Sequence, residues 1–261
     1  LLSLDTLRGF NMFWIIGGAE ILSEIADRVN NPFLNEVTAN FAKHVDWVGI
    51  HYHDMIFPLF LFLMGVSLPF SAQKRLEKGG DNRTLVVKAV KRTFMLIAMG
   101  YLYYHILDLK GWEHQRLFGV LQRLALGYGF AAVICLKTPR KAQPYIAGAI
   151  LIAYYLIMLL VPVPGQVADS MAEYGRWGQW GNVANYVDRV LMLPGQMHEK
   201  YGDPEGLLST IPAIVTCMLG IFSGRWLMSD RSGNEKARGL LMAGAAAIAL
   251  GYAWSPLFPV I

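Results

Sequence analysis

The sequence predicts an all-α, polytopic transmembrane helix bundle. Hydrophobic residues make up 54% of the 261 residues, and charged residues make up only 16%. A soluble domain usually carries nearer a quarter charged residues, and the mean hydropathy of this chain is +0.36. Apolar stretches recur along the chain, each close to the roughly 20 residues that a helix needs to cross a bilayer. We therefore expect one continuous membrane domain over residues 1–261, in about seven helices.

The first of the seven stretches is the weakest, because Gly17, Gly18 and Glu20 interrupt it. A cleaved signal peptide is the other interpretation of this stretch, but no A-x-A-like cleavage site follows it. The predicted membrane helices cover residues 7–25, 55–72, 85–107, 117–136, 144–163, 206–228 and 237–261.

Lys and Arg residues predict the orientation, since cytoplasmic loops carry an excess of both. The loops after the second, fourth and sixth segments are rich in them, and the alternate loops are poorer. The N-terminus is therefore expected in the cytoplasm. The rich loops hold Lys74, Arg75, Lys78, Arg83, Lys88, Lys91 and Arg92, then Lys137, Arg140 and Lys141, then Arg225, Arg231, Lys236 and Arg238. The poorer loops hold Arg28 and Lys43, then Lys110 and Arg116, then Arg176, Arg189 and Lys200.

Compartment and partners follow from the same loops. The one N-x-S/T sequon begins at Asn82 in the most basic loop, and the outer loops have none. This favours a bacterial inner membrane over a glycosylating route. The net charge is only +4 and lies in particular loops, so we expect membrane lipid and no nucleic acid as partners. Both cysteines lie in apolar segments, so no disulfide framework is expected.

All six histidines fall on or near the predicted outer side, and the richest stretch is residues 44–54. It places His44, His51 and His53 with two carboxylates directly before a membrane helix. Histidine titrates near neutrality and can act as base, nucleophile or metal ligand. Asp54 stands at the start of the helix, where helix capping is the alternative role. A zinc site formed by these side chains is a rival interpretation. However, the H-x-H spacing brings two rings together only on extended chain, whereas this stretch runs into a helix, so no metal is expected.

Charged residues at membrane helices form three further candidate groups. Arg123 lies seven residues inside the fourth segment, about 10 Å below its outer end, where an ionised group is usually paired or lines a wet cavity. Asp5 and Arg8 open the first segment on the cytoplasmic side, where a helix cap, a lipid headgroup or a bound phosphate are the alternatives. Asp203 and Glu205 precede the sixth segment, and Asp-Pro is first of all the pattern of a helix start.

Four blocks of sequence, in this order, resemble the heparan-α-glucosaminide N-acetyltransferase family. They are SLDTLRG, then H-x-x-W with an Asp ten residues after the His and FP close behind, then GVLQRL, then DPEGLLSTI followed by LG-x-x-x-G. The resemblance implies an enzyme that moves acetyl from cytoplasmic acetyl-CoA to the amino group of a terminal glucosamine across the membrane. It also implies further helices beyond residue 261. In relatives a polar Asn stands near the outer end of the first helix, where this chain has Gly17 and Gly18.

The motif match, together with the residues around it, gives the candidate site residues of this chain. The catalytic histidine in the first outer loop becomes His44, as general base or as acetyl carrier, and Asp54 fixes its tautomer. Acetyl-CoA is then the expected co-substrate. The cofactor region would include Asp5, Arg8, Gln122 and Arg123. The acceptor side would include Trp47, His51, His53, Asp203 and Glu205.

Two other function classes stay open from the sequence. A sugar or amino-sugar permease also suits broken helices and intramembrane charge, although no inverted repeat is visible. A structural scaffold is the third class, and the polar stretch at residues 44–54 counts against it. A homodimer is also open.

Overall fold

Helices make up most of the residues that the computed structural model describes, which are 2–107, 111–168 and 170–260. In that part of the chain β-structure is limited to two isolated bridges. The helices are α1 (Leu2–Phe13), α2 (Ala19–Val29), α3 (Pro32–Phe41), α4 (Tyr52–Leu76), α5 (Asn82–Leu107), α6 (Val120–Lys137), α7 (Gln143–Leu160), α8 (Val183–Leu191), α9 (Thr210–Leu227) and α10 (Gly233–Trp254), with a π-helix at Trp14–Gly18 and 3₁₀ turns at Trp112–His114 and Pro194–Gln196. The predicted all-α bundle is confirmed.

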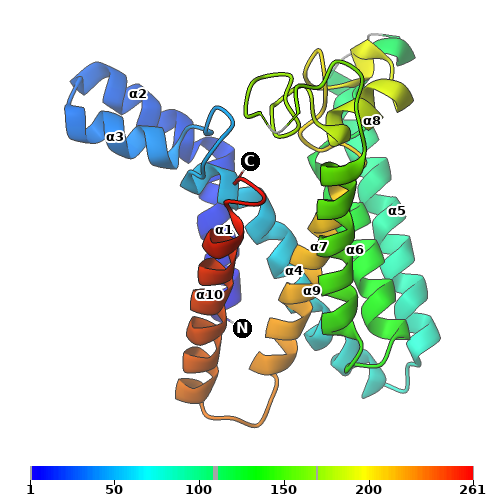
Figure 1. Ribbon diagram of the computed structural model, residues 1–261. Coiled ribbons are helices and arrows are strands. Elements are labelled where there is room, and N and C mark those ends of the chain that lie inside the picture. Colours follow the sequence, from blue (N-terminus) through cyan, green and yellow to red (C-terminus); the bar gives the residue numbers. More distant parts are fainter. Residues whose placement is uncertain (1, 108–110, 169, 261) are drawn as a thin grey trace.

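The centre of the bundle is the crossing of α4 and α9 (Figure 1). Glycines make the close approach possible, because a Cβ on Gly65 would collide with the backbone of Cys217, and one on Gly220 with the backbone of Phe62. Small residues at helix contacts are typical of membrane bundles, where no water is squeezed out and packing carries association. Leu61, Met218 and Ile221 of the same crossing are fully buried. Helix α6 packs against both partners and against α5.

Five of the described helices are long and apolar enough to cross a membrane: α4, α6, α7, α9 and α10. The chain is therefore a multi-pass membrane protein, and five of the seven predicted segments correspond to described helices of this kind. Helix α5 is long enough at 26 residues, yet Arg83, Lys88, Lys91 and Arg92 lie in its first half. With so many charged residues, the first half of α5 is too polar to count as part of a membrane span.

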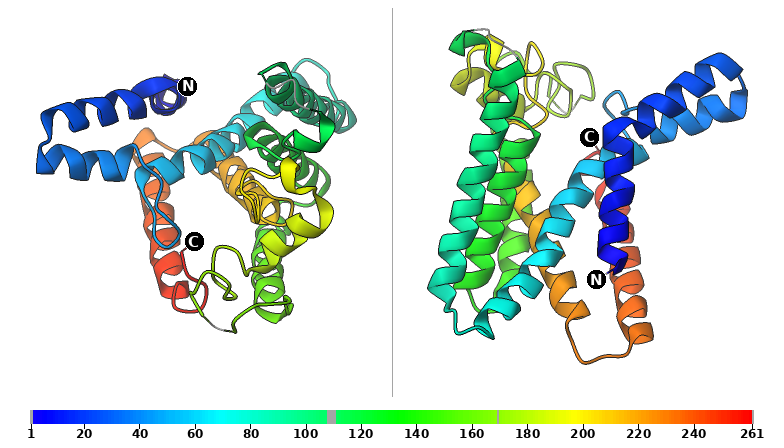
Figure 2. Two further views of the ribbon diagram at one scale, coloured as in Figure 1. Left: turned by 90° about the horizontal axis from the view of Figure 1, so that it is seen from above. Right: turned by 180° about the vertical axis from the view of Figure 1, so that it is seen from behind.

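The predicted segment over residues 7–25 is not one continuous helix, because the chain breaks inside it. Helix α1 ends at Phe13, the π-helix follows, and Gly17 leaves helical geometry with φ 165°. Gly18 lies against the ring of Phe13, where a Cβ would collide. After this break α2 turns sideways and pairs with α3, so that the two helices form a hairpin that projects from the bundle (Figure 2).

The two ends of the bundle differ in composition. Residues 161–168 and 170–209, here called the cap, cover the end at which α4, α6 and α9 begin (Figure 1). The basic loops 77–81, 138–142 and 228–232 lie at the opposite end. The three loops that the sequence analysis assigned to one side of the membrane therefore lie at the same end of the bundle. Lys110, which was counted among the loop charges, lies outside the described residues.

Candidate active site

The first group of candidate site residues lies where α4 begins. The Asp54 carboxylate accepts a hydrogen bond from the backbone N–H of His51 through Oδ2 at 2.8 Å, which caps the helix. Its other oxygen, Oδ1, lies 2.6 Å from His44 Nδ1. Capping and histidine binding were alternatives from sequence, and one carboxylate does both. The side chain of His44 is 70% exposed.

The pairing with Asp54 sets the chemistry of His44. A carboxylate at Nδ1 favours the tautomer with its proton on that nitrogen, which leaves Nε2 with a free lone pair. The ring is then oriented by one nitrogen and open to a substrate at the other. An imidazole held in this way can act as a general base or as a nucleophile.

The two other histidines of this stretch differ in their contacts, and only His53 is seen to contact His44. The ring of His53 stands edge to face with that of His44, with centroids 4.5 Å apart. His53 Nδ1 is buried and finds no hydrogen-bond partner among the described residues. His51 Nδ1 lies 3.1 Å from the carbonyl of Lys43. No group of three His, Cys, Asp or Glu side chains in the described part of the chain could hold a metal ion.

Trp47 ties this loop to the cap. Its Nε1–H donates to the backbone carbonyl of Trp177 at 2.7 Å. The backbone N–H of Gly49 donates to the carbonyl of Val260 at 2.9 Å, and Gly49 has a φ of 122° that favours glycine. Two long-range hydrogen bonds therefore hold the loop that carries His44.

The second group is an ion-pair cluster between the loop before α6 and the turn before α9. Arg116 Nε and Nη2 donate to both oxygens of Asp203, at 3.0 and 2.6 Å. Arg116 also pairs with Glu205. The side chain of Asp203 is fully buried. Burial alone would lower the pKa of Arg116, but the two carboxylates outweigh it and raise the pKa, so the guanidinium stays charged. Asp203 and Glu205 are thus both ion-paired with Arg116, a residue that the sequence analysis did not propose for the site.

Arg123 joins this turn to the His44 end of α4. Its guanidinium donates to the carbonyl of Pro204, and at 3.0 Å to the carbonyl of Ser209. The same group lies 5.4 Å from the ring centroid of Phe57, one helical turn after Asp54. Its Nε is buried and has no hydrogen-bond partner in the described residues. Arg123 is therefore paired mainly with backbone carbonyls, as a helix anchor.

Gln122, the neighbour of Arg123, is buried with its polar atoms unused. Both its amide oxygen and its amide nitrogen lack a partner among the described residues, and the side chain packs against Gly100 of α5. A buried amide without hydrogen bonds costs free energy in a membrane bundle, so it marks a place where a polar ligand group or water would be stabilising.

Asp5 and Arg8 lie far from the other predicted residues. Arg8 pairs with Asp5 at 2.9 Å and contacts the hydroxyl of Ser67 on α4. Ser67 is 13 residues after Asp54, or about 20 Å along the helix at 1.5 Å per residue. The predicted cofactor residues thus spread from the end of α4 that carries His44 towards the opposite end.

Asp188 was missed by the sequence analysis. It lies on α8, is 1% exposed, and accepts a hydrogen bond from the N–H of Leu207 at 3.0 Å through Oδ1. Burial, together with repulsion from Asp203, raises the pKa of Asp188 to about 6, although the Leu207 N–H lowers it. Its Oδ2 has no partner in the described residues and lies against Gly206. In sequence Asp188 is one polar residue of a short amphipathic helix, a pattern that usually indicates a solvated carboxylate.

Comparisons with known proteins agree with the four motifs. The family model described as heparan-alpha-glucosaminide N-acetyltransferase, catalytic, matches residues 1–252. The human protein named heparan-alpha-glucosaminide N-acetyltransferase is 28% identical over 229 residues, which cover 72% of this chain and 34% of the relative. The mouse protein of the same name is also 28% identical over 229 residues, and 35% of it is covered. The chain thus spans about a third of the length of the curated relatives it matches.

Proposed function

The chain belongs to the heparan-alpha-glucosaminide N-acetyltransferase catalytic family, and on that premise we propose that it is a membrane-embedded acetyltransferase. The reaction would move acetyl from cytoplasmic acetyl-CoA to the amino group of a glucosamine-type sugar on the outer side. The observation that carries this proposal is the 2.6 Å contact between His44 Nδ1 and Asp54 Oδ1. It leaves Nε2 as the basic atom of an exposed imidazole.

Two routes use this histidine. As a general base, His44 Nε2 takes the proton from the sugar amine while nitrogen attacks the thioester carbon; the C–S bond then breaks, and the thiolate takes up the proton. As an acetyl carrier, Nε2 attacks the thioester itself, releases CoA, and passes acetyl to the amine in a second step. In both routes Asp54 holds the ring and stabilises its positive charge.

The co-substrate has to reach His44 from the cytoplasmic side. Asp5 and Arg8 would meet CoA near the end of α4 that is remote from His44, and a cationic Arg8 suits a phosphate. Gln122 and Arg123 lie nearer His44, and each has a buried polar atom without a partner in the described residues. The side-chain amide of Gln122 has both N–H donors and a carbonyl acceptor, so it would suit the amide groups of the pantetheine arm.

The acceptor sugar would approach from the cap. Trp47, His51 and His53 belong to the same stretch as His44. The ring of His53 contacts that of His44, and its Nδ1 lacks a partner in the described part of the chain. Asp203 and Glu205 are paired with Arg116, so we expect them to shape this side rather than to bind the sugar directly.

We expect the protein to lie in a bacterial inner membrane, surrounded by lipid, with its N-terminus in the cytoplasm. A homodimer is the assembly to test.

A chemical assay separates this proposal from a permease. The purified protein is mixed with acetyl-CoA and glucosamine, and the release of free CoA thiol and the formation of N-acetylglucosamine are measured. We expect both products in equal amounts. Uptake of the amino sugar into proteoliposomes without acetyl-CoA, with no acetylated product when acetyl-CoA is added, would contradict the proposal and favour transport.

A further inference from the structure

The hairpin of α2 and α3 has an architecture that the proposed acetyltransferase site does not explain. The hairpin closes through Asn30, which has a positive φ of 48°, and Asn31, whose side chain accepts from the N–H of Phe33 at 2.9 Å and caps α3. Ala26 and Thr38 are buried between its two helices. Both views show the hairpin leaving the bundle sideways rather than covering it (Figures 1 and 2).

The surface of α2 that does not contact α3 is apolar on one side. Ile21, Ile25 and Val29, at helical spacings of four, are each about half exposed, and Phe33 beyond the turn is 70% exposed. The opposite side of α2 carries acidic residues. Between residues 19 and 41 the chain has four acids, Glu20, Glu24, Asp27 and Glu36, against the single base Arg28, which pairs with Glu24 at 2.7 Å. The hairpin is thus amphipathic, with an apolar stripe that no described residue covers.

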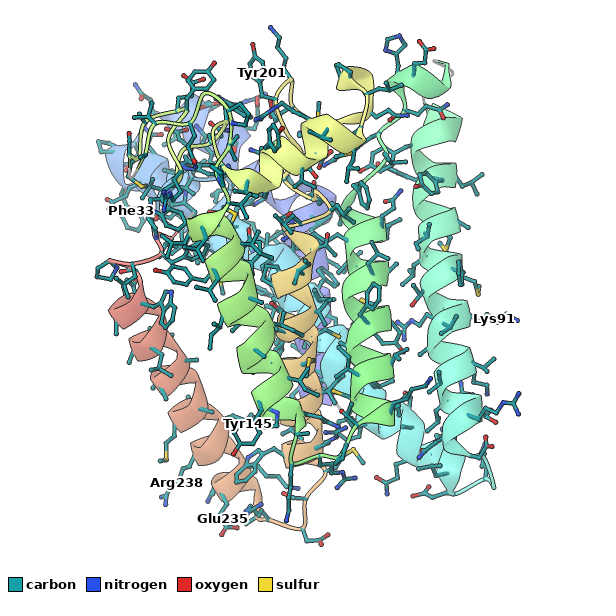
Figure 3. The ribbon with its side chains drawn as sticks, turned by 45° about the vertical axis from the view of Figure 1, so that its right-hand side comes forward. Phe33, Lys91, Tyr145, Tyr201, Glu235 and Arg238 are labelled. Carbon is teal, nitrogen blue, oxygen red and sulfur yellow. The ribbon has the colours of Figure 1, made fainter. Side chains whose placement is uncertain are left out.

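The position of the hairpin relates this stripe to a membrane. In Figure 3 the labelled Phe33 lies level with the ends of α6, α7 and α9 that face the cap, whereas Tyr201 of the cap lies farther out. Helix α1, which leads into the hairpin, packs along the span α4, where Asn11 Nδ2 donates to the carbonyl of Ile56 at 3.5 Å. The outward side of α1 and of the π-helix that follows it is apolar and exposed at Phe10, Phe13 and Ile16. The apolar surface therefore continues from the membrane part of the chain onto α2.

We propose that the hairpin of α2 and α3 lies in the membrane–water interface at the cap end, with lipid as its partner. The stripe of Ile21, Ile25 and Val29 would lie among the upper acyl chains, and Glu20, Glu24 and Asp27 would face water. A helix with one apolar and one charged face takes this position in bilayers. Because acids outnumber bases, the lipid headgroups would be zwitterionic rather than anionic.

This position has a consequence for the proposed reaction. Helix α3 ends at Phe41, three residues before His44. A hairpin held at the interface would therefore fix the His44 loop at the membrane surface, where an amino sugar arrives from the water. The membrane position itself does not depend on the proposed function, since it follows from the hairpin alone.

Spin labels on single cysteines test the proposal in phosphatidylcholine proteoliposomes. The native Cys135 and Cys217, both buried, are replaced by alanine. Labels are placed on the two faces of α2 by Ile25→Cys and Asp27→Cys. Ile248→Cys on α10 serves as the lipid control, and Lys200→Cys in the cap serves as the water control. Relaxation by oxygen, which concentrates in hydrocarbon, is compared with relaxation by a water-soluble nickel chelate.

We expect the label at position 25 to behave like that at 248 and the label at position 27 to behave like that at 200. Preferential relaxation of label 25 by the nickel chelate would overturn the proposal, because the stripe would then lie in water. Protection of label 25 from both reagents would also overturn it, in favour of a second copy or another protein segment on this face. If Ile25→Cys fails to fold, Val29→Cys on the same stripe gives the same comparison.

Discussion

The buried carboxylate of Asp188 is expected to make the stability of the folded protein depend on pH. Its pKa of about 6 stands about two units above the ordinary value of an aspartate. The folded state therefore favours the protonated form. The contribution of this group to stability is most favourable below about pH 4, declines as pH rises, and is lost above pH 6. At about 1.4 kcal/mol for each pKa unit, the charged form costs about 3 kcal/mol at neutral pH.

Asp188→Asn removes this dependence on pH. The asparagine keeps an oxygen for the Leu207 N–H but does not titrate. We expect the free energy of unfolding of the variant, relative to the unmodified protein, to rise by about 3 kcal/mol between pH 4 and pH 7.5. Chemical unfolding of the purified protein in detergent, followed by tryptophan fluorescence, measures this difference. Asp230→Asn, at an exposed position, is the control. The reasoning would be refuted if the difference in unfolding free energy between Asp188→Asn and the unmodified protein stayed constant over this pH range.

Three further substitutions test the packing around the site. Gly220→Ala should lower the free energy of unfolding by about 1–3 kcal/mol because its methyl group has no room against α4, whereas Gly244→Ala, in open space, should not; equal melting temperatures for the two variants would contradict this. Arg116→Met should cost about 3–5 kcal/mol, since two partly or fully buried carboxylates lose their partner; denaturant curves that match the unmodified protein would exclude this pairing. Trp47→Phe should cost about 1 kcal/mol by losing one hydrogen bond and should speed proteolysis between the loop and the cap; an unchanged digestion rate would count against that link.

Much of the fold was predictable because a bilayer imposes a simple pattern. The apolar stretches in α4, α6, α7, α9 and α10 are long, and their ends are marked by basic loops, so composition alone located them. The first stretch failed for a local reason. Its mean composition is apolar, but Gly17 and Gly18 allow a break, and amphipathic α2 then finds a partner in α3. A window average does not detect a turn at two glycines.

Contacts within the candidate site could be predicted where the two residues lie close in sequence. His44 and Asp54 are ten residues apart in one motif, and that motif predicted the contact that the structure shows between them. Arg116 pairs with Asp203 across 87 residues, and Asp188 reaches Leu207 across 19. No short pattern encodes such contacts. Sequence alone therefore did not reveal that Asp203 and Glu205 are both paired with Arg116.

The most direct test of the central claim is the initial rate of acetyl transfer by His44→Ala. The rate is measured with acetyl-CoA and glucosamine at equal amounts of folded protein, beside His198→Ala, an exposed histidine of the cap. A positioned general base contributes about 10²- to 10⁴-fold to a rate. We predict a loss of at least about 100-fold for His44→Ala and an unchanged rate for His198→Ala. A rate for His44→Ala close to that of the unmodified protein would contradict the assignment of His44.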